Sequence, residues 1–240
     1  LAINDWVEDK TKDKIKELLS KGDVDSSTQF VLVNALYLFA NWQNLFMKES
    51  TSEAPFTTLN GDLVSVSTMH QTEPMLYKTT ESFDVVQLPY VTGKLHLTVV
   101  LPKAGQFETV RSAVSADWLD SANSGLTSEN VALSLPKFQI ETAQMRLIPA
   151  LEALGFFDAG STLSGIGDEP VAISEVIQKA FIGTDESGTE AAAATAVGLA
   201  TGLPSQSVVV TCDRPFLFFI QAESGLVLFS GQVVDLTQKS

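Results

Sequence analysis

With 240 residues, 45% of them hydrophobic, the chain has enough apolar side chains for one well-packed domain. Its 29 acidic residues outnumber its 15 basic residues and give a net charge of −14, which argues against nucleic acid and anionic membranes as partners, because both are bound by basic patches. No apolar run approaches the length of a membrane span, and the single cysteine, Cys212, excludes an internal disulfide.

The first forty residues are predicted to hold helical segments followed by a long strand. Residues 1–7 have the pattern of the end of an amphipathic helix. Ile15, Leu18 and Leu19 then repeat at helical spacing, and Gly22 is a plausible stop. Residues 30–42 are almost entirely apolar and rich in Val, Phe, Tyr and Leu, which predicts a buried central strand.

The middle and the end of the chain alternate between short apolar runs and turn residues. Strands are predicted at residues 63–68, 75–79, 83–88, 95–101, 131–135 and 138–142. Helices are predicted at residues 107–114, 118–122 and 147–154. The last strands, 216–222 and 226–234, form a hairpin, and because both are nearly all apolar we expect both in the core. Together these elements predict a single α+β domain over residues 1–240.

The segment after Asp185 is unusual for a loop. From Gly188 through Cys212 the only charged side chain is Glu190. If residues 188–197 form a strand, one face carries only small uncharged side chains and valine: Thr189, Ala191, Ala193, Thr195 and Val197. Four alanines in a row more often indicate a helix or a flexible connector. This segment is therefore a loop that could become a central strand, unless it is helical.

Enzymatic chemistry has little support in the sequence. The two histidines, His70 and His96, lie in strand-like patterns where a structural role is the simpler interpretation. No G-x-S-x-G elbow, phosphate loop or metal-spaced cluster of ligand residues occurs. We therefore expect no catalytic residues, no metal and no cofactor. If the chain does not adopt the predicted fold, the alternative function is that of an interaction or adhesion domain.

Several blocks of sequence, in order along the chain, resemble the serpins, a family of serine protease inhibitors. The blocks are residues 3–7, 33–39, 134–138, 172–182, 185–195, 214–220 and 225–233. The resemblance covers essentially the whole chain and corresponds to the C-terminal two thirds of a serpin domain, so we expect a preceding part that this chain lacks. It implies large mixed and antiparallel β-sheets, surrounding helices, and an exposed reactive loop at about residues 186–207.

The resemblance also implies roles for individual residues. The hinge of the reactive loop would comprise Glu186, Gly188, Thr189, Glu190, Ala191, Ala192, Ala193, Ala194 and Thr195. The region where the main sheet opens would include Asn34, Trp42 and Gln178. Gln178 stands where many serpins carry a histidine, so the resemblance does not extend to a histidine-based pH effect at this position. Asp185 replaces a common asparagine just before the hinge.

The family's spacing, fourteen residues beyond the hinge glycine, implies a reactive bond between Gly202 and Leu203. The segment up to Pro215 is slightly longer than usual, so the bond could shift by a residue or two. Contacts to the protease would come from nearby loop residues: Val197, Leu199, Ala200 and Thr201. None is basic, which disfavours trypsin-like enzymes.

A serpin acts as a suicide substrate: the protease cleaves the loop, which then inserts into the main sheet and traps the enzyme. The expected partner is a serine protease of elastase-, subtilisin- or chymotrypsin-like type. A proline or an inward charge would stall insertion, and neither occurs before Pro204, which favours an inhibitor. The alternative is a non-inhibitory serpin that acts as a carrier, chaperone or storage protein. The expected location is extracellular, with a cytoplasmic one left open.

Overall fold

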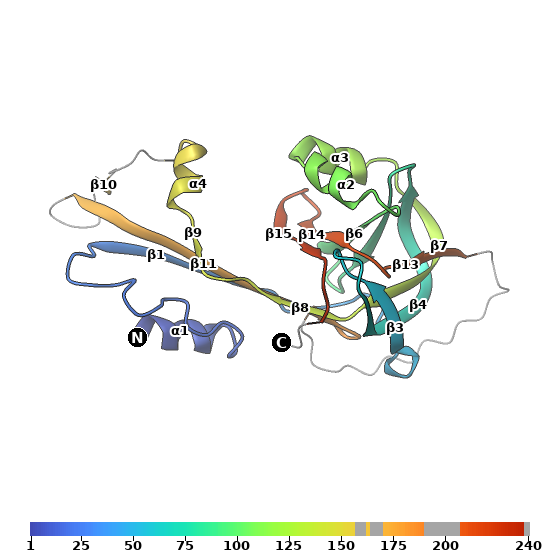
Figure 1. Cartoon of the computed structure of the whole chain (residues 1–240), viewed down its shortest axis with the longest axis horizontal. Helices are drawn as coiled ribbons and strands as arrows, with labels where there is room; N and C mark the ends of the chain where they lie inside the picture. The colour runs from blue at the N-terminus through green and yellow to red at the C-terminus, as the bar shows by residue number, and fades with distance from the viewer. Residues whose placement is uncertain (157–161, 164–169, 190–206, 238–240) are drawn as a thin grey trace. The chain divides into compact units, whose positions relative to one another are not determined.

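The computed structural model describes residues 1–156, 162–163, 170–189 and 207–237. Figure 1 shows its elements from the blue N-terminus to the red C-terminus. The helices are α1 (Ala2–Lys10), η1 (Lys48–Ser50, a 3-10 turn), α2 (Phe107–Ala113), α3 (Ala116–Asn123) and α4 (Ile148–Ala153). The strands are β1 (Phe30–Tyr37), β2 (Ala40–Asn41), β3 (Ser52–Thr57), β4 (Leu63–Thr79), β5 (Phe83–Pro89), β6 (Leu95–Pro102), β7 (Thr127–Pro136), β8 (Phe138–Glu141), β9 (Met145–Arg146), β10 (Thr162–Leu163), β11 (Val171–Asp185), β12 (Gly188–Thr189), β13 (Val208–Thr211), β14 (Phe216–Ala222) and β15 (Val227–Val233).

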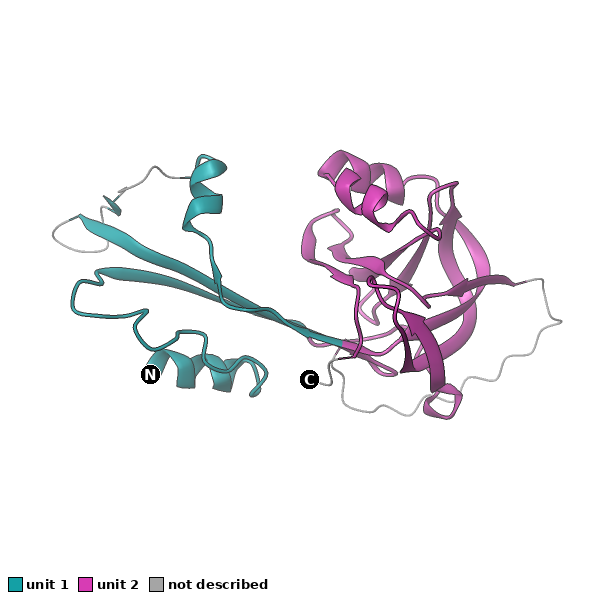
Figure 2. Cartoon of the chain, in the orientation of Figure 1, with its two compact units in different colours: residues 1–38, 139–182 teal, residues 39–138, 183–240 magenta. Residues whose placement is uncertain are grey.

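The chain divides into two compact units, coloured separately in Figure 2. Unit 1 comprises residues 1–38 and 139–182, and unit 2 comprises residues 39–138 and 183–240. Strand β11 therefore begins in unit 1 and ends in unit 2. Both units combine strands with helices, in agreement with the predicted α+β class.

Unit 1 is built on two parallel strands. β1 pairs with β11 from Phe30 opposite Ile173 to Tyr37 opposite Phe181, and β9 pairs with β11 in the antiparallel sense. The single strand predicted at residues 30–42 is wrong. β1 ends at Tyr37, and the next short strand, β2, belongs to unit 2 and has β12 as its partner instead of β11.

The face of these two strands is covered by α1 and the segment that follows it, residues 11–29. Ile15 and Leu18 are fully buried against Ile177 and Phe181 of β11. The helical spacing of these residues does not produce a helix here, so that prediction is wrong. Lys12, Asp13 and Glu17 have positive φ angles, which are incompatible with a right-handed helix, and turns bury the apolar side chains instead.

Unit 2 holds a sheet of eight described strands in the order β13-β7-β4-β5-β6-β14-β15, with β3 also paired to β4. The strands predicted at 63–68 and 75–79 are halves of β4. They merge because β7 pairs with β4 without interruption from Thr68 opposite Pro136 to Tyr77 opposite Thr127. The other strands and short helices predicted between residues 83 and 154 are confirmed, with small shifts of their ends.

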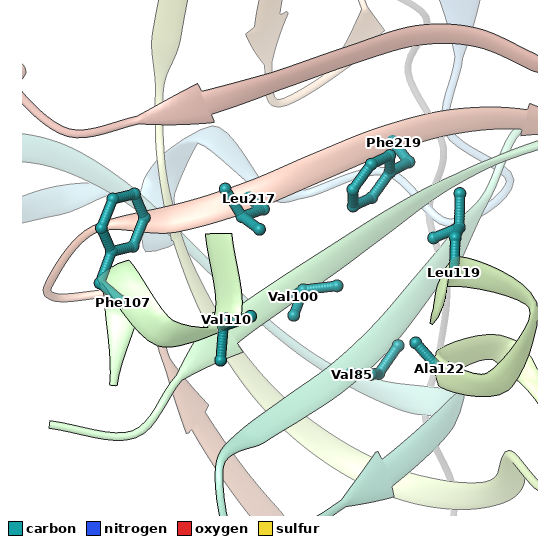
Figure 3. Packing of buried hydrophobic residues seen from close by; sticks show 8 residues of the cluster. All are labelled: Val85, Val100, Phe107, Val110, Leu119, Ala122, Leu217 and Phe219. Atoms are coloured by element: carbon teal, nitrogen blue, oxygen red, sulfur yellow. The ribbon is translucent and has the colours of Figure 1, made fainter. Parts of the chain in front are cut away.

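Helices α2 and α3 cover one face of β5, β6 and β14, as Figure 3 shows. The cluster that joins them consists of Val85, Val100, Phe107, Val110, Leu119, Ala122, Leu217 and Phe219. Helix α3 begins where the Ser115 hydroxyl accepts a hydrogen bond from the Trp118 N–H at 3.1 Å, a common N-cap arrangement. Unit 2 thus has its own core.

The final hairpin differs from the prediction in one strand. β14 is buried along nearly its whole length, as expected, but β15 is largely exposed. Val227 and Leu228 keep 39% and 37% of their surface accessible. β15 is more exposed because it is the last strand in the described order of the sheet, whereas β14 has a neighbouring strand on both edges.

Candidate functional site

The turn that leads into the hinge lies at the end of β11 and is held by Asp185. Its carboxylate accepts hydrogen bonds from the backbone N–H groups of Ser187 at 2.8 Å and Gly188 at 3.2 Å. An Asp or Asn side chain bonding the backbone two residues ahead stabilises a tight turn. Asp185, which stands where the resemblance has a common asparagine, therefore stabilises the turn through which the chain reverses into β12.

The described part of the hinge already lies in a sheet. Thr189 pairs with Thr184 of β11, and on its other edge β12 pairs with β2, with Thr189 opposite Ala40. Thr189 is fully buried. The first residues of the predicted loop are thus the start of a strand with a neighbour on each side.

Gly188 is required by this close approach. Its φ is +152°, and a Cβ atom there would lie 2.1 Å from the Ala40 carbonyl oxygen and 2.7 Å from the Asn41 Cα. Both obstacles are backbone atoms of β2, which cannot rotate away. Only glycine lets β12 pack against β2.

Glu186 carries a buried negative charge with matched partners. Lys137 donates from Nζ to the two carboxylate oxygens at 3.0 and 3.2 Å, and the Thr51 hydroxyl donates at 2.9 Å. The Glu186 side chain is 8% exposed. Burial alone raises the pKa of the Glu186 carboxyl, but the hydrogen bonds from its own backbone N–H, Lys137 and Thr51 outweigh burial, and the pKa is lowered. Glu186 is therefore ionised at neutral pH.

Two stacked aromatic rings form a wall beside β12. Trp42 and Tyr90 lie with their ring centroids 4.7 Å apart and their planes 13° from parallel. The Trp42 indole N–H donates to the Asp185 carbonyl oxygen at 2.9 Å, and the Tyr90 hydroxyl is 2.6 Å from the Thr189 hydroxyl. Burial raises the pKa of Tyr90, so the phenol stays neutral. The wall thus contacts the hinge on both sides of its turn.

Of the three residues predicted at the sheet opening, the structure brings two together in unit 1. Asn34 and Gln178 are opposite each other in the β1–β11 ladder, and the Asn34 amide donates to the Gln178 side-chain oxygen at 3.0 Å. Trp42 lies in unit 2 with the hinge, as described above.

Most of the predicted loop lies outside the described residues. This holds for the hinge residues Glu190, Ala191, Ala192, Ala193, Ala194 and Thr195, for the contact residues Val197, Leu199, Ala200 and Thr201, and for the bond between Gly202 and Leu203. The far end of the loop is described: it continues into β13, which pairs in parallel with β7 from Val208 opposite Val131. Both ends of the loop are therefore anchored in unit 2.

Three residues of the site were missed from the sequence: Thr51, Tyr90 and Lys137. Lys137 lies in one of the blocks that resemble serpins, between two strands, but nothing local pairs it with Glu186. Tyr90 follows Pro89 at the end of β5. Nothing in the sequence around Thr51 indicates that it contacts the hinge. Each is brought to the hinge by sheet register, which the local sequence does not encode.

The described site is thus a short strand between two others, with an aromatic wall and a buried carboxylate beside it. The chain matches the family model described as serpin (serine protease inhibitor) over residues 1–236. It therefore belongs to the serpin family, whose described role is protease inhibition rather than enzymatic catalysis.

The chain is similar to serpins from distant organisms. An uncharacterized serpin-like protein of Thermococcus kodakarensis is 37% identical over 240 residues, which are 97% of this chain and 55% of that protein. The human leukocyte elastase inhibitor is 38% identical over 249 residues, covering 96% of this chain and 65% of that protein. The solved structure of human thyroxine-binding globulin superposes with a TM-score of 0.84 at 31% identity, covering 99% of this chain and 64% of that one.

The chain thus spans a little over half to two thirds of the length of these relatives. Within the described ranges, no helix has both the length and the apolar character needed to cross a membrane. No group of three or more His, Cys, Asp or Glu residues that could hold a metal ion occurs in the described part of the chain.

Proposed function

We propose that the protein to which this chain belongs inhibits a serine protease as a suicide substrate. The protease cleaves the reactive loop, and the residues that follow Thr189 then extend β12 into a full strand between β11 and β1. The observation that carries the proposal is the position of β12, which already lies between β11 and β2 while the chain is uncut.

The pattern of side chains supports insertion. Thr189 is fully buried, so in a continuous strand Ala191, Ala193, Thr195 and Val197 would face the same interior. All four are small or aliphatic and bring no charge into it. Glu190 would face the opposite side of the sheet. A strand of this composition can enter between two others without an unpaired buried charge.

The free energy of insertion is large enough to drive the process. About a dozen residues that become a central strand form a similar number of ladder hydrogen bonds, each worth roughly 0.5–1.5 kcal/mol net, or on the order of 10 kcal/mol in total. This is comparable with the stability of a whole domain. The uncut loop cannot gain it, because Val208 and the residues after it are held in β13. Cleavage is therefore the trigger.

We further propose an elastase-like target. Val197, Leu199, Ala200 and Thr201 are small or aliphatic, and the loop has no Arg or Lys for a trypsin-like pocket. The human relative that is 38% identical is named for inhibition of leukocyte elastase. Subtilisin- and chymotrypsin-like enzymes are the other candidates, because the loop offers them uncharged side chains as well. We also propose that the reactive bond joins Gly202 and Leu203, or lies one or two residues from this position.

A carrier function is the second candidate, since thyroxine-binding globulin shares the fold. In the described residues of unit 2, a cavity of about 260 Å³ is lined by polar side chains that include Gln87, His96, Asn123 and Gln221. Drug-sized ligands occupy mostly apolar pockets of about 300–1,000 Å³. This cavity is smaller and more polar, so inhibition is the better supported function.

The test uses the full-length protein and pancreatic or leukocyte elastase. We expect an SDS-resistant complex heavier than either component, and none with elastase whose nucleophilic serine is replaced by alanine. Mass spectrometry of the released peptide identifies the cleaved bond. Cleavage without a complex would indicate the carrier function, and an uncut loop would contradict both.

Thr189→Arg is the matched control for the mechanism. It places a charge at a fully buried position, so the variant should be cleaved without forming the complex. A stable covalent complex with this variant would refute insertion at the hinge. We also propose an extracellular location, which is tested by measuring the protein in the cells that produce it and in their medium.

A further inference from the structure

We propose that Tyr90 is a positioning residue for loop insertion: its hydroxyl holds the Thr189 hydroxyl inside the sheet before cleavage, so that insertion starts from a strand that already exists. The proposal rests on the inhibitory function above but concerns a contact that is present in the uncut protein. We call the Tyr90–Thr189 pair the latch.

The latch is a buried contact with little freedom. Tyr90 and Thr189 are both fully buried, and their hydroxyl oxygens are 2.6 Å apart. The Tyr90 ring is fixed by its stacking on Trp42 and by its backbone N–H, which donates to the Leu95 carbonyl at 3.0 Å. A buried hydroxyl that loses its partner is costly. The geometry therefore favours Thr189 in the sheet over Thr189 in the loop.

A neighbouring hydroxyl shows that the contact is selective. Thr184 lies directly opposite Thr189 on β11, and its buried hydroxyl has no hydrogen-bond partner in the described structure. Cross-strand threonine pairs often bond to each other. Thr189 instead contacts Tyr90, which ties the start of the loop to the end of β5 in addition to its pairing with β11.

The latch matters because loop insertion competes in rate with hydrolysis of the acyl-enzyme. After cleavage the loop must insert before water hydrolyses the acyl-enzyme, and the fraction that loses this competition leaves as cleaved substrate. The first residues that enter the sheet lose conformational entropy and form few hydrogen bonds in return. Later residues extend a strand that is already paired. Holding Thr189 in place removes that first step from the period after cleavage.

Tyr90→Phe tests the latch because it keeps the ring and its stacking on Trp42 and removes only the hydroxyl. With the full-length protein and elastase, we expect the insertion rate to fall roughly two- to tenfold, the range for loss of one buried hydrogen bond. The number of inhibitor molecules consumed per trapped protease should rise accordingly. The insertion rate is measured from the fluorescence change of a fluorophore attached within the loop.

Thr189→Val completes a double-mutant cycle, because valine matches threonine in shape and lacks the hydroxyl. If the latch is real, the two single variants and the double variant have similar insertion rates. Additive effects would overturn the proposal. Tyr77→Phe is the matched control: its hydroxyl donates to Asp84 at 2.9 Å in the same unit, away from the hinge. It should leave the insertion rate and the stoichiometry unchanged.

Hydrogen exchange of the uncut protein separates this proposal from the proposed function. In Tyr90→Phe, amides of the peptide 184–189 should exchange several-fold faster than in the wild type, whereas Tyr77→Phe should leave them unchanged. Unchanged exchange in Tyr90→Phe would overturn the latch whether or not the protein inhibits a protease. Faster exchange in a protein that traps no protease would retain the latch and reject inhibition.

Discussion

At the scale of single residues, Gly188 and Glu186 show how tightly the hinge is built. Gly188 lies where a Cβ atom would overlap the backbone of β2. Glu186 keeps a buried charge with Lys137 and Thr51 as partners. Position 188 has no room for a side chain, and position 186 requires a negative charge. Both therefore respond to substitutions that would be mild on an exposed loop.

Gly188→Ala should destabilise the protein by about 1–3 kcal/mol, the usual cost of added volume in a packed site. The methyl group must displace the Ala40 carbonyl, now 2.1 Å from its position. Gly93→Ala is the matched control, since Gly93 also has a positive φ, +67°, but nothing lies within 4 Å of its Cβ position. Urea unfolding of both variants measures the difference. Equal losses would show that backbone strain, and not the clash, determines the cost.

Lys137→Met should cost about 1–3 kcal/mol at pH 7, because it leaves the buried Glu186 carboxylate without its cation. The loss depends on pH. The folded-state pKa of Glu186 is lowered from 4.5, so the stabilisation is present above pH 4.5 and disappears as the pH falls through the lowered pKa. The difference between wild type and variant should shrink over that range. The exposed pair Lys10–Asp9 supplies the control, and Lys10→Met should change stability by less than about 1 kcal/mol. A loss that is independent of pH would contradict this interpretation.

At the scale of elements, the segment between α1 and β1 is held by packing rather than by regular structure. Residues 11–29 contain no helix or strand, yet Ile15, Leu18 and Leu19 are buried on unit 1. Apolar spacing alone cannot distinguish a helix from a series of turns that buries the same side chains. The buried area, and not the helical hydrogen bonds, must therefore stabilise this segment.

Leu18→Ala should lower the free energy of unfolding by about 2–5 kcal/mol, because the side chain is fully buried and leaves a cavity. Val24→Ala, in the same segment but 43% exposed, should change it by less than about 0.5 kcal/mol. Denaturant unfolding monitored by circular dichroism compares the two. Similar small effects would mean that the segment is not packed on unit 1 in solution.

At the scale of the whole molecule, the proposed mechanism requires that the cleaved form be lower in free energy than the uncut form. β1 and β11 are paired directly over eight residue pairs in the uncut chain. In the proposed mechanism, the inserted loop would replace this one interface between strands by two. The cleaved form should therefore be the more stable one, which is the reverse of the usual effect of a cut in the backbone.

Cleavage of the loop in the full-length protein should raise the melting temperature by roughly 10 °C or more, since about 10 kcal/mol of added stability corresponds to about 2–4 °C per kcal/mol at 150–250 residues and to less in a longer chain. Calorimetry before and after cleavage measures the shift. Thr189→Arg, cleaved in the same way, should show little or no rise. An unchanged or lower melting temperature in the cleaved wild type would contradict insertion.

The sequence by itself determined the fold class and the family. The strands and short helices between residues 83 and 154 could be predicted because period and turn residues are local signals. Glu186, Gly188 and Thr189 could be predicted as hinge residues because they lie in one continuous block of residues that resembles serpins. These features depend on neighbours along the chain.

The tertiary structure alone decided which residues complete the site. Thr51, Tyr90 and Lys137 reach the hinge from three separate segments because sheet register places them there. The end of β1 at Tyr37, the turns of residues 11–29 and the exposure of β15 have the same kind of cause. Each of these features depends on a pairing partner or a packed face that is distant in sequence. The spacing of apolar residues along the local sequence does not indicate that partner or face.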